Sequence, residues 1–472
     1  MSATRETGGA SATRLEPPSL RGHPLWGNMR GFQRAPLGFM REAARHGDVV
    51  RYRMAHMTWY QVNHPEGVRR VLQERNHDYG KGTLTARVLR PVLGDGLFIS
   101  EGDMWLRQRR LMQPVFHRRS VAAFGELMTA AALETLERWE PLARRGEPFD
   151  AQAEMTRLTL EIVTAALFSS HVGDEREAVS SAISTLVEDV SYRFEVPFYP
   201  PLSVPTPRNR RMRAALRTLD AAVYRIIEEH REREDASDLL ALLMTARDPE
   251  TGEAMSDKQL RDEVITLFIA GHETTANALT WAWYLLARNP EVETRLRAEL
   301  DAELGNGPPA MADLPALPYT RMVLDETLRL YPPAWITNRQ ALVDDEILGY
   351  RIPAGAIVML SPYVLHRHPH LWERPDEFDP ERFSPERSVG RPRFAYFPFG
   401  GGPRQCIGKT MALTEAQLVL ATIARRYRLR LVADRSVEPL ALATLRPRDG
   451  LRVVAEHAGS GTQKREPQRS PR

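Results

Sequence analysis

The longest predicted helix constrains the fold more than any other part of this sequence. It begins at Ser256, which forms a capping box with Gln259, and it ends before Pro290. That is about 32 residues, or roughly 48 Å at 1.5 Å per residue. Its apolar members include Val264, Leu267, Phe268, Ile269 and Leu279. Because these residues fall on several faces, we expect the helix to cross the core of the domain.

The middle of this helix does not suit a buried position. It reads Ala-Gly-His-Glu-Thr-Thr from Ala270 to Thr275. Glycine and β-branched residues weaken a helix, and burying an unpaired carboxylate is costly. Small residues would leave room for a ligand, a hydroxyl could bond to a carbonyl or hold water, and Glu273 could relay protons. The alternative is a kink with a solvated Glu273.

The single cysteine of the chain, Cys406, lies in a loop rich in glycine. Residues 397–408 contain four glycines and two prolines, which exclude regular structure up to Cys406. A helix is predicted from Lys409 to Arg425, so Cys406 precedes a helix N terminus, where backbone amides favour a thiolate. Glycines also let a flat ligand approach the backbone. The alternative is a cysteine that packs as a small hydrophobic residue.

The loop carries a motif of defined spacing. The pattern Phe-Gly-x-Gly-x-Arg-x-Cys-x-Gly is met at all six specified positions, which are Phe399, Gly400, Gly402, Arg404, Cys406 and Gly408. Through this motif the chain resembles the cytochrome P-450 family of haem-thiolate monooxygenases. The resemblance extends over residues 17–454 and implies a mainly α fold with a smaller β region. In that fold, haem b lies between the long central helix and the cysteine loop.

The resemblance also implies roles for residues around the haem. Cys406 would ligate the iron as a thiolate, Phe399 would pack against its sulfur, and Gly271 would lie beside the haem. Glu273 and Thr274 occupy the acid and alcohol positions of the family's oxygen-activation motif. They are the expected proton relay.

Four further side chains would hold the haem propionates, and they are Trp105, Arg109, Arg339 and Arg404. A haem carries two carboxylates, so cationic partners are physically required. The alternative for Trp105 and Arg109, which follow each other at i,i+4 spacing, is a solvated basic face with a core tryptophan.

Three charged residues resemble the family's structural cluster. Glu326 and Arg329 lie on one face of a predicted helix, and Arg382 belongs to a Pro-Glu-Arg-Phe segment. We expect them to maintain the fold and the haem pocket and to take no part in the chemistry. The alternative for Glu326 and Arg329 is an exposed salt bridge of about 0.3 kcal/mol.

The residues that the resemblance places around the substrate are mostly apolar. They are Leu84, Leu97, Phe98, Phe268, Ala270, Ala334, Trp335, Ile336 and Leu445. They favour a hydrophobic molecule such as a terpene, fatty acid, steroid or macrolide, without choosing among these. The segment from Pro197 to Pro207 matches the family's mobile lid, and a buried proline-rich turn is the alternative.

The expected activity is insertion of one atom of O2 into this molecule by hydroxylation or epoxidation. Electrons would come from a separate ferredoxin or flavodoxin with its reductase, docked near Cys406 through Arg107, Arg110 and Arg404. One alternative is a peroxide-driven peroxygenase, which would not need an acid–alcohol relay. The others are a non-catalytic haem-thiolate sensor or carrier and a redox or scaffold protein without haem.

Composition limits the other function classes. The 64 basic and 61 acidic side chains give a net charge of +3, so there is no electrostatic case for nucleic acid as a partner. A single cysteine excludes an intramolecular disulfide and a multi-cysteine zinc site. His366, His368 and His370 form only a weak metal-site pattern. No signal peptide and no apolar run of about 18 residues is found, so we expect a soluble, cytoplasmic, bacterial monomer without a membrane anchor.

The chain is predicted to form one domain with two tails. Residues 1–20 are expected to be a flexible tail, residues 21–456 the catalytic domain and residues 457–472 a disordered tail. Inside the domain, residues 48–62 are predicted to form a β-hairpin and residues 79–103 a long surface loop.

Overall fold

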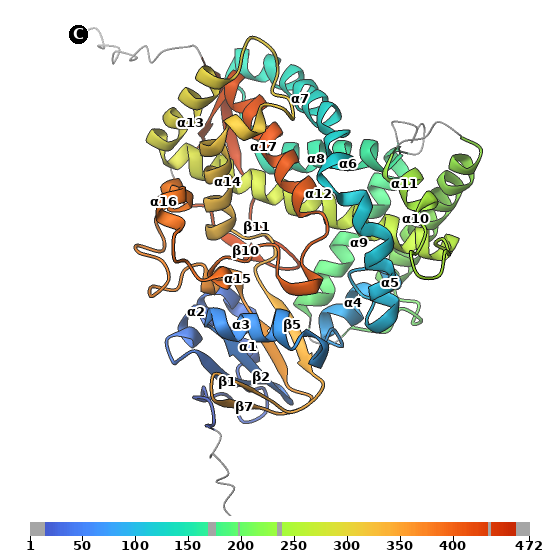
Figure 1. Cartoon of the computed structure of the whole chain (residues 1–472), viewed down its shortest axis with the longest axis vertical. Coiled ribbons are helices and arrows are strands. Elements are labelled where there is room, and N and C mark those ends of the chain that lie inside the picture. The colour runs from blue at the N-terminus through green and yellow to red at the C-terminus, as the bar shows by residue number, and fades with distance from the viewer. Residues whose placement is uncertain (1–14, 169–175, 197–198, 234–237, 433–435, 459–472) are drawn as a thin grey trace, which may run out of the picture.

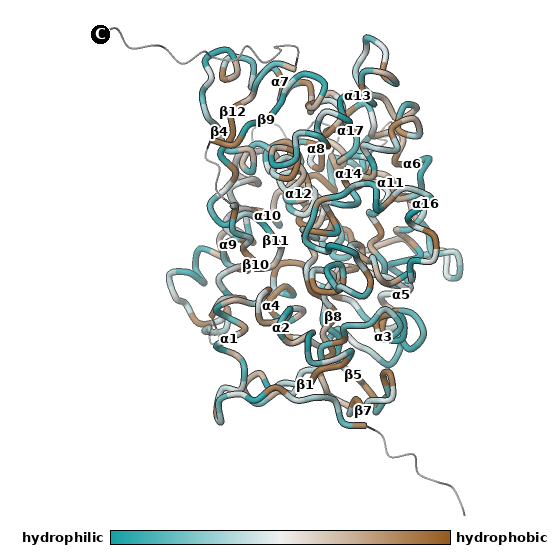
Figure 2. The backbone as a smooth tube through the Cα atoms, turned by 90° about the vertical axis from the view of Figure 1, so that its left-hand side faces the viewer, coloured by the Kyte–Doolittle hydropathy of each residue, from teal (hydrophilic) through white to brown (hydrophobic). Residues whose placement is uncertain are grey.

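Helices fill most of this molecule, and its two larger sheets lie at opposite ends (Figures 1 and 2). The structure is a computed structural model that describes residues 15–168, 176–196, 199–233, 238–432 and 436–458. Within these ranges, every helix is too short or too polar to span a lipid bilayer.

The longest helix, α12 (Asp257–Arg288), runs through the centre of the molecule (Figure 1). The other helices of the described residues are α1 (Met29–Arg34), α2 (Pro36–Ala44), α3 (Pro65–Arg69), α4 (Leu84–Leu93), α5 (Gly102–Met112), α6 (Arg118–Ala122), α7 (Gly125–Arg145), α8 (Ala151–Phe168), α9 (Arg176–Glu195), α10 (Pro207–Arg231), α11 (Leu239–Thr245), α13 (Pro290–Glu303), α14 (Pro318–Leu330), α15 (Pro362–Leu365), α16 (Pro385–Ser388) and α17 (Lys409–Arg426). Helices α8, α10, α14 and α17 pack against α12. Together they build the largest apolar core.

The sheets are small. One has the order β1-β2-β8-β5-β3 and consists of β1 (Val49–Met54), β2 (Met57–Val62), β3 (Tyr79–Gly80), β5 (Thr337–Ala341) and β8 (Ile357–Leu360). Only β2 and β8 pair in parallel in it. The second has the order β4-β12-β9 and consists of β4 (Phe149–Asp150), β9 (Tyr427–Leu431) and β12 (Arg452–His457). Two hairpins pair β6 (Asp345–Ile347) with β7 (Tyr350–Ile352) and β10 (Pro439–Ala441) with β11 (Leu445–Pro447).

The central helix has the predicted length and cap. It contains 32 residues, and the Ser256 hydroxyl accepts a hydrogen bond from the Gln259 amide at 3.3 Å. Trp281 and Trp283 are buried in its second half. Local signals suffice here, because a capping serine and a proline delimit a segment with continuous apolar character.

The predicted hairpin over residues 48–62 is confirmed by β1 and β2, which pair antiparallel from Val49 opposite Val62. The predicted long loop over residues 79–103 is wrong, because α4 lies within it. Val88, Val92 and Leu93 form a buried stripe on one face of α4. This short stripe between glycines is enough to dock a helix on the core, although it gives a weak pattern in the sequence.

The two predicted tails lie mostly outside the described residues. Residues 15–20 are described, and backbone hydrogen bonds hold them against the first sheet. The Leu20 amide donates to the Arg51 carbonyl at 2.9 Å, and the Arg51 amide donates to the Pro18 carbonyl at 2.8 Å. The predicted tails and domain limits stay predictions.

Candidate active site

The central helix opens to solvent in its middle, where the sequence predicted a site. Ala270 is exposed and Gly271, Glu273 and Thr274 are half-buried, whereas the flanking turns of α12 are mainly buried. The Thr274 hydroxyl donates to the Ala270 carbonyl oxygen at 2.7 Å. This bond to the preceding turn fixes the hydroxyl on the same face as Ala270. The helix is continuous through this turn.

Glu273 is paired and not simply solvated. Its Oε1 accepts a hydrogen bond from the Thr444 hydroxyl at 2.6 Å, and the Asn277 amide donates to the same hydroxyl at 3.0 Å. Thr444 lies in the turn between β10 and β11, far from α12 in sequence. Sequence reasoning missed Thr444 and Asn277, because nothing local in the sequence places this turn beside the central helix.

Gly271 has a packing role that the sequence did not predict. A Cβ at this position would lie 3.1 Å from Cγ2 of Val163 on α8. That separation is tighter than ordinary van der Waals contact, so the glycine allows α8 and α12 to approach closely. Its predicted contact with the cofactor stays a prediction.

The Cys406 loop adopts a conformation that depends on glycine. Gly400 and Gly402 have φ angles of 67° and 66°. A Cβ on Gly402 would collide with the Leu72 carbonyl oxygen, so the loop lies directly on that backbone. The Cys406 amide donates to the Phe399 carbonyl at 3.0 Å, which closes the loop just before α17. Glycine is therefore required for both backbone conformation and close approach.

The surroundings of Cys406 have opposing effects on the pKa of its thiol. Part of the residue is accessible to solvent, yet protein atoms surround the sulfur densely. Burial raises the pKa of the Cys406 thiol, whereas a hydrogen bond from the Gly408 backbone and the charges of Arg109 and Lys409 lower it. Burial has the larger effect. The thiolate predicted at this helix N terminus stays a prediction.

Three cations gather beside this loop with one carboxylate among them. Burial, and then the charge of Arg404, lowers the pKa of Arg339 to about 10, and the charge of Glu101 opposes this. Burial also lowers the pKa of Lys81, and both arginines lower it further. The Lys81 side chain keeps some access to solvent, but the surrounding protein is dense enough for burial to dominate. We call Lys81, Arg339 and Arg404 the cation cluster.

The predicted propionate ligands Trp105 and Arg109 lie next to the cation cluster. The Arg404 guanidinium stacks on the Trp105 ring, 4.3 Å from its centroid, and donates to the Ser100 carbonyl at 2.9 Å. Arg109 donates to the Gln405 carbonyl at 2.8 Å. Buried cations that outnumber their carboxylate partners require an anion. This arrangement fits a ligand with two carboxylates.

Lys81 was not predicted from the sequence. Its ammonium donates to the Phe98 carbonyl at 2.6 Å and lies 4.5 Å from the centroid of the Phe98 ring. The available signal was compositional. Lysine occurs at only four positions in this arginine-rich chain, so a lysine between two glycines stood out.

Glu326, Arg329 and Arg382 meet in the core, as the sequence predicted. Arg329 donates two hydrogen bonds to the Glu326 carboxylate, at 2.6 and 2.8 Å, and Arg382 donates a third at 3.2 Å. All three side chains are buried. Arg329 also donates to the carbonyl oxygen of His366, whose Nε2 accepts from the Phe397 amide at 2.9 Å. The cluster therefore supports the start of the Cys406 loop.

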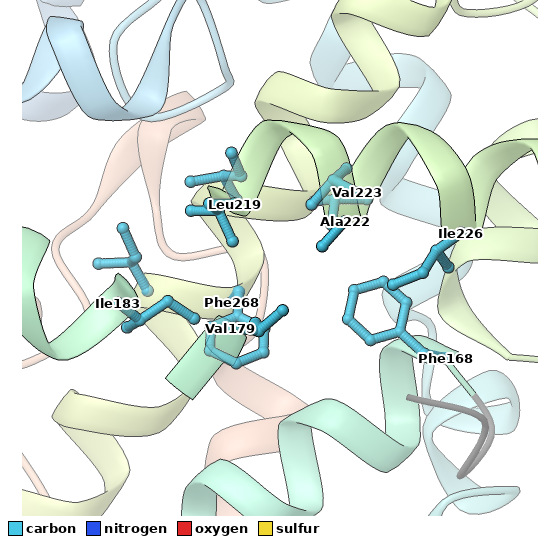
Figure 3. A pocket seen from close by; sticks show the side chains of 11 residues that line it. Phe168, Val179, Ile183, Leu219, Ala222, Val223, Ile226 and Phe268 are labelled. Carbon is cyan, nitrogen blue, oxygen red and sulfur yellow. The ribbon is translucent and has the colours of Figure 1, made fainter. Parts of the chain in front are cut away.

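The candidate substrate residues do not all lie together. Leu97, Trp335 and Leu445 are buried, Ile336 is half-buried, and Leu84, Phe98 and Ala334 are exposed. Phe268 points into an apolar pocket between α8, α9, α10 and α12 (Figure 3). Phe268 and Ala270 are two positions apart, about 200° around the helix axis, which puts them on opposite sides of α12. The structure thus separates Phe268 from the face that carries Ala270 and Thr274.

Two of the expected docking residues are occupied by structural contacts. Arg110 pairs with Asp248 at 3.2 Å, and Arg107 donates to Gln259 at 3.1 Å and to the Ala254 carbonyl at 3.0 Å. These bonds attach α5 to the segment before α12, because the acidic loop there faces the helix. Arg107 and Arg110 are therefore not free for a redox partner.

The remaining motifs have structural explanations. Among the described residues, no group of three or more histidine, cysteine or acidic side chains is placed to hold a metal ion. His366 is a hydrogen-bonded core residue. The predicted lid is described from Tyr199 onward, and Asn209 donates to the carbonyls of Pro201 and Val204, at 2.8 Å each. Pro197 and Phe198 lie outside the described residues.

Comparison with known proteins decides the family. Residues 17–452 match the family described as Cytochrome P450. The chain belongs to the cytochrome P450 family. This P450 is 41% identical to cyclooctatin synthase of Streptomyces melanosporofaciens, with 89% of this chain and 91% of that protein covered. Pentalenene oxygenase of Streptomyces avermitilis is 37% identical, with 89% and 93% covered.

A solved structure agrees with the fold of this P450. The haem domain of cytochrome P450DA superposes with a TM-score of 0.85 at 30% identity, with 94% of this chain and 98% of that chain covered. The predicted family and the mainly α fold with a smaller β region are confirmed. The protein is a haem-dependent monooxygenase, as the family and its monooxygenase relatives show. The alternative of a redox or scaffold protein without haem is wrong.

Proposed function

We propose that this P450 inserts one atom of O2 into a cyclic terpene by hydroxylation or epoxidation. The relatives named pentalenene oxygenase and cyclooctat-9-en-7-ol 5-monooxygenase, each 37% identical, support this substrate class. One structural observation carries the proposal. The exposed Ala270 and the half-buried Thr274 lie on a helix that is otherwise mainly buried, and the substrate would bind beside this face of α12.

Cys406 is the proposed thiolate ligand of the haem iron. When bound, the haem activates O2, and electron donation from a cysteine thiolate favours cleavage of the O–O bond. The glycine loop holds the sulfur at a fixed place between Phe399 and the start of α17. Because burial alone raises the pKa of the Cys406 thiol, the iron's positive charge is what would keep the thiolate in this site.

The cation cluster, with Trp105 and Arg109, is the proposed site for the haem propionates. Lys81, Arg339 and Arg404 carry more positive charge than Glu101 balances, and two propionates would balance it. Trp105 fixes the Arg404 guanidinium by stacking on it. The residues present therefore fit the group that the family implies.

Thr274 and Glu273 are the proposed proton relay. The Thr274 hydroxyl donates to the Ala270 carbonyl and keeps its lone pairs for a water or substrate oxygen on the exposed face. Glu273 Oε1 is engaged by Thr444, and no described residue donates to Oε2. Oε2 is thus the oxygen at which Glu273 can take up and release a proton.

A separate ferredoxin or flavodoxin system is the proposed electron source. It would dock through Arg118 and Arg119 on α6 and Lys409 on α17, because these cations are exposed and α6 packs on α17. The charge of Lys409 already reaches Cys406. Acidic partners are steered to such patches by long-range attraction. A monomeric state and a cytoplasmic location stay predictions.

Turnover of the haem-loaded protein tests the proposed function. Cyclic terpenes and fatty acids are screened for a substrate-induced spin shift, and product is measured with NADH, a surrogate ferredoxin and its reductase. We expect a spin shift and oxygenated product with a terpene. A response to fatty acids alone would contradict the substrate class, and equal turnover with hydrogen peroxide alone would favour the peroxygenase.

Replacing the relay alcohol separates its role from substrate binding. Thr274→Ala should keep haem content and the spin shift but lower product per NADH about tenfold, because electrons then leave as peroxide. The matched control is Thr280→Val, since among the described residues that hydroxyl donates only to the Ala276 carbonyl, at 2.7 Å. If Thr274→Ala gave as much product per NADH as the control, the Thr274 hydroxyl would have no part in the relay.

A further inference from the structure

The turn between β10 and β11 is fastened to the central helix and to the segment before β5. The Trp281 indole donates to the Leu445 carbonyl at 3.1 Å, and the Trp335 indole donates to the Leu442 carbonyl at 2.9 Å. The Leu445 amide donates to the Pro333 carbonyl at 3.0 Å. In Figure 1, β10 and β11 lie at the centre of the molecule, close to α12. This turn is therefore a rigid support beside the relay.

Thr444 lies in this turn between a donor and an acceptor. The Asn277 amide nitrogen can only donate, so it uses a lone pair of the Thr444 oxygen, at 3.0 Å. An ionised carboxylate can only accept, so the Thr444 hydrogen is directed to Glu273 Oε1, at 2.6 Å. The hydrogen bonds therefore run in one direction, from Asn277 through Thr444 to Glu273.

Both ends of this series of hydrogen bonds lie on one face of the central helix. Glu273 and Asn277 are four residues apart, so they are neighbours on the helix surface. Asn277 is buried and its side chain has little freedom. Thr444 comes from the turn before β11, which is far from α12 in the sequence. The conformation of Glu273 thus depends on a residue 171 positions away in the sequence.

We infer that Thr444 is a positioning residue for the oxygenation reaction, holding the Glu273 carboxylate so that Oε1 is committed and Oε2 serves the proton relay. This inference rests on the proposed relay of Glu273 and Thr274. A glutamate side chain otherwise samples several rotamers, and a displacement of about 1 Å can cost up to a hundredfold in rate. Thr444 limits that freedom through its hydrogen bond to Glu273, whereas the Thr274 hydroxyl bonds to Ala270.

Thr444→Val and Thr444→Ser test the inference in the haem-loaded protein. Valine keeps the shape and removes the hydroxyl, whereas serine keeps the hydroxyl. We expect Thr444→Val to keep the Soret band of the carbon monoxide complex and the spin shift while product per NADH falls about tenfold. Thr444→Ser and the control Thr280→Val should give as much product per NADH as the wild type. Equal coupling in Thr444→Val and wild type would overturn the inference.

A second variant and a crystal structure separate positioning from other effects. In a Glu273→Gln background, Thr444→Val should cause no further loss, because the two changes act through one carboxylate. A full further loss would show that Thr444 acts without Glu273, which overturns the inference. A crystal structure of Thr444→Val should show the Glu273 carboxylate displaced, and an unmoved carboxylate contradicts positioning. If Glu273→Gln alone gave as much product per NADH as the wild type, Glu273 would have no part in the relay, and the inference would fail with it.

Discussion

Glu263 is a fully buried acid on the central helix, two turns before Ala270. Its Oε2 accepts a hydrogen bond from the Leu97 amide at 2.9 Å, and no described residue donates to Oε1. Burial raises the pKa of Glu263 to about 8, against the lowering effect of that hydrogen bond. The hydrogen bond thus fixes the loop before α5 to α12, whereas burial favours the protonated form of the Glu263 carboxyl group.

This raised pKa predicts a pH-dependent effect on stability. The folded protein keeps the Glu263 proton after the unfolded chain has lost it, so this contribution is full below the ordinary pKa and is lost as the pH rises through about 8. Glu263→Gln keeps the acceptor for Leu97 and removes the titration. As the pH rises from 5 to 8, the free energy of unfolding of the wild type should therefore fall relative to that of Glu263→Gln by roughly 1.4 kcal/mol per pH unit.

Urea unfolding of both proteins at pH 5, 6.5 and 8 measures this difference. Other buried acids, such as Glu415, are present in both proteins and cancel. A difference that stays constant with pH would show that Glu263 titrates normally in the folded protein.

At the scale of elements, the Cys406 loop depends on two glycines for different reasons. Gly400 and Gly402 share φ angles near the left-handed region, at 67° and 66°. A Cβ on Gly400 meets nothing within 4 Å, whereas one on Gly402 collides with the Leu72 backbone. The two positions therefore separate conformational strain from close packing.

Alanine at each position should show this separation. Gly400→Ala should cost about 1 kcal/mol of unfolding free energy, which is the strain of an alanine at positive φ. Gly402→Ala should cost clearly more and lower haem content, because the loop must leave the backbone of Leu72. Denaturant midpoints and the haem-to-protein ratio measure both variants. Equal losses would mean that the contact with Leu72 does not hold the loop.

The elements also show where the sequence was sufficient. The limits of α12 and α17 were predicted to within about two residues, because caps, prolines and glycines mark them. The helix α4 was missed, since its apolar stripe has only three buried residues. Cys406, Thr274 and the arginines followed from a family motif. Thr444 and Lys81 did not, because their partners come from distant segments and no local pattern records such a pairing.

At the scale of the whole molecule, the cation cluster joins segments that are far apart in the chain. Lys81, Arg339 and Arg404 come from the region after β3, from β5 and from the Cys406 loop. Their mutual repulsion lowers the pKa of Lys81 and Arg339 beyond the effect of burial. The protein thus carries a local electrostatic cost that the bound cofactor would relieve.

This cost predicts that one substitution has opposite effects with and without haem. Lys81→Met keeps a long, unbranched side chain and removes one of the repelling charges. The apoprotein should become more stable by about 1 kcal/mol, whereas haem affinity should fall about tenfold, because a charge-assisted hydrogen bond is lost. Thermal unfolding of the apoprotein and haem titration measure the two effects. If the stability of the apoprotein and the affinity for haem changed in the same direction, a propionate role for Lys81 would be contradicted.

The central claim is that Cys406 binds the haem iron as a thiolate. Carbon monoxide bound to the reduced, haem-loaded protein tests it most directly, with the Soret band as the readout. We expect a strongly red-shifted band in the wild type and its loss in Cys406→Ser, with haem content used to confirm that the variant still holds the cofactor. A well-folded wild type without the red-shifted band, or a Cys406→Ser variant that retains it, would contradict the assignment.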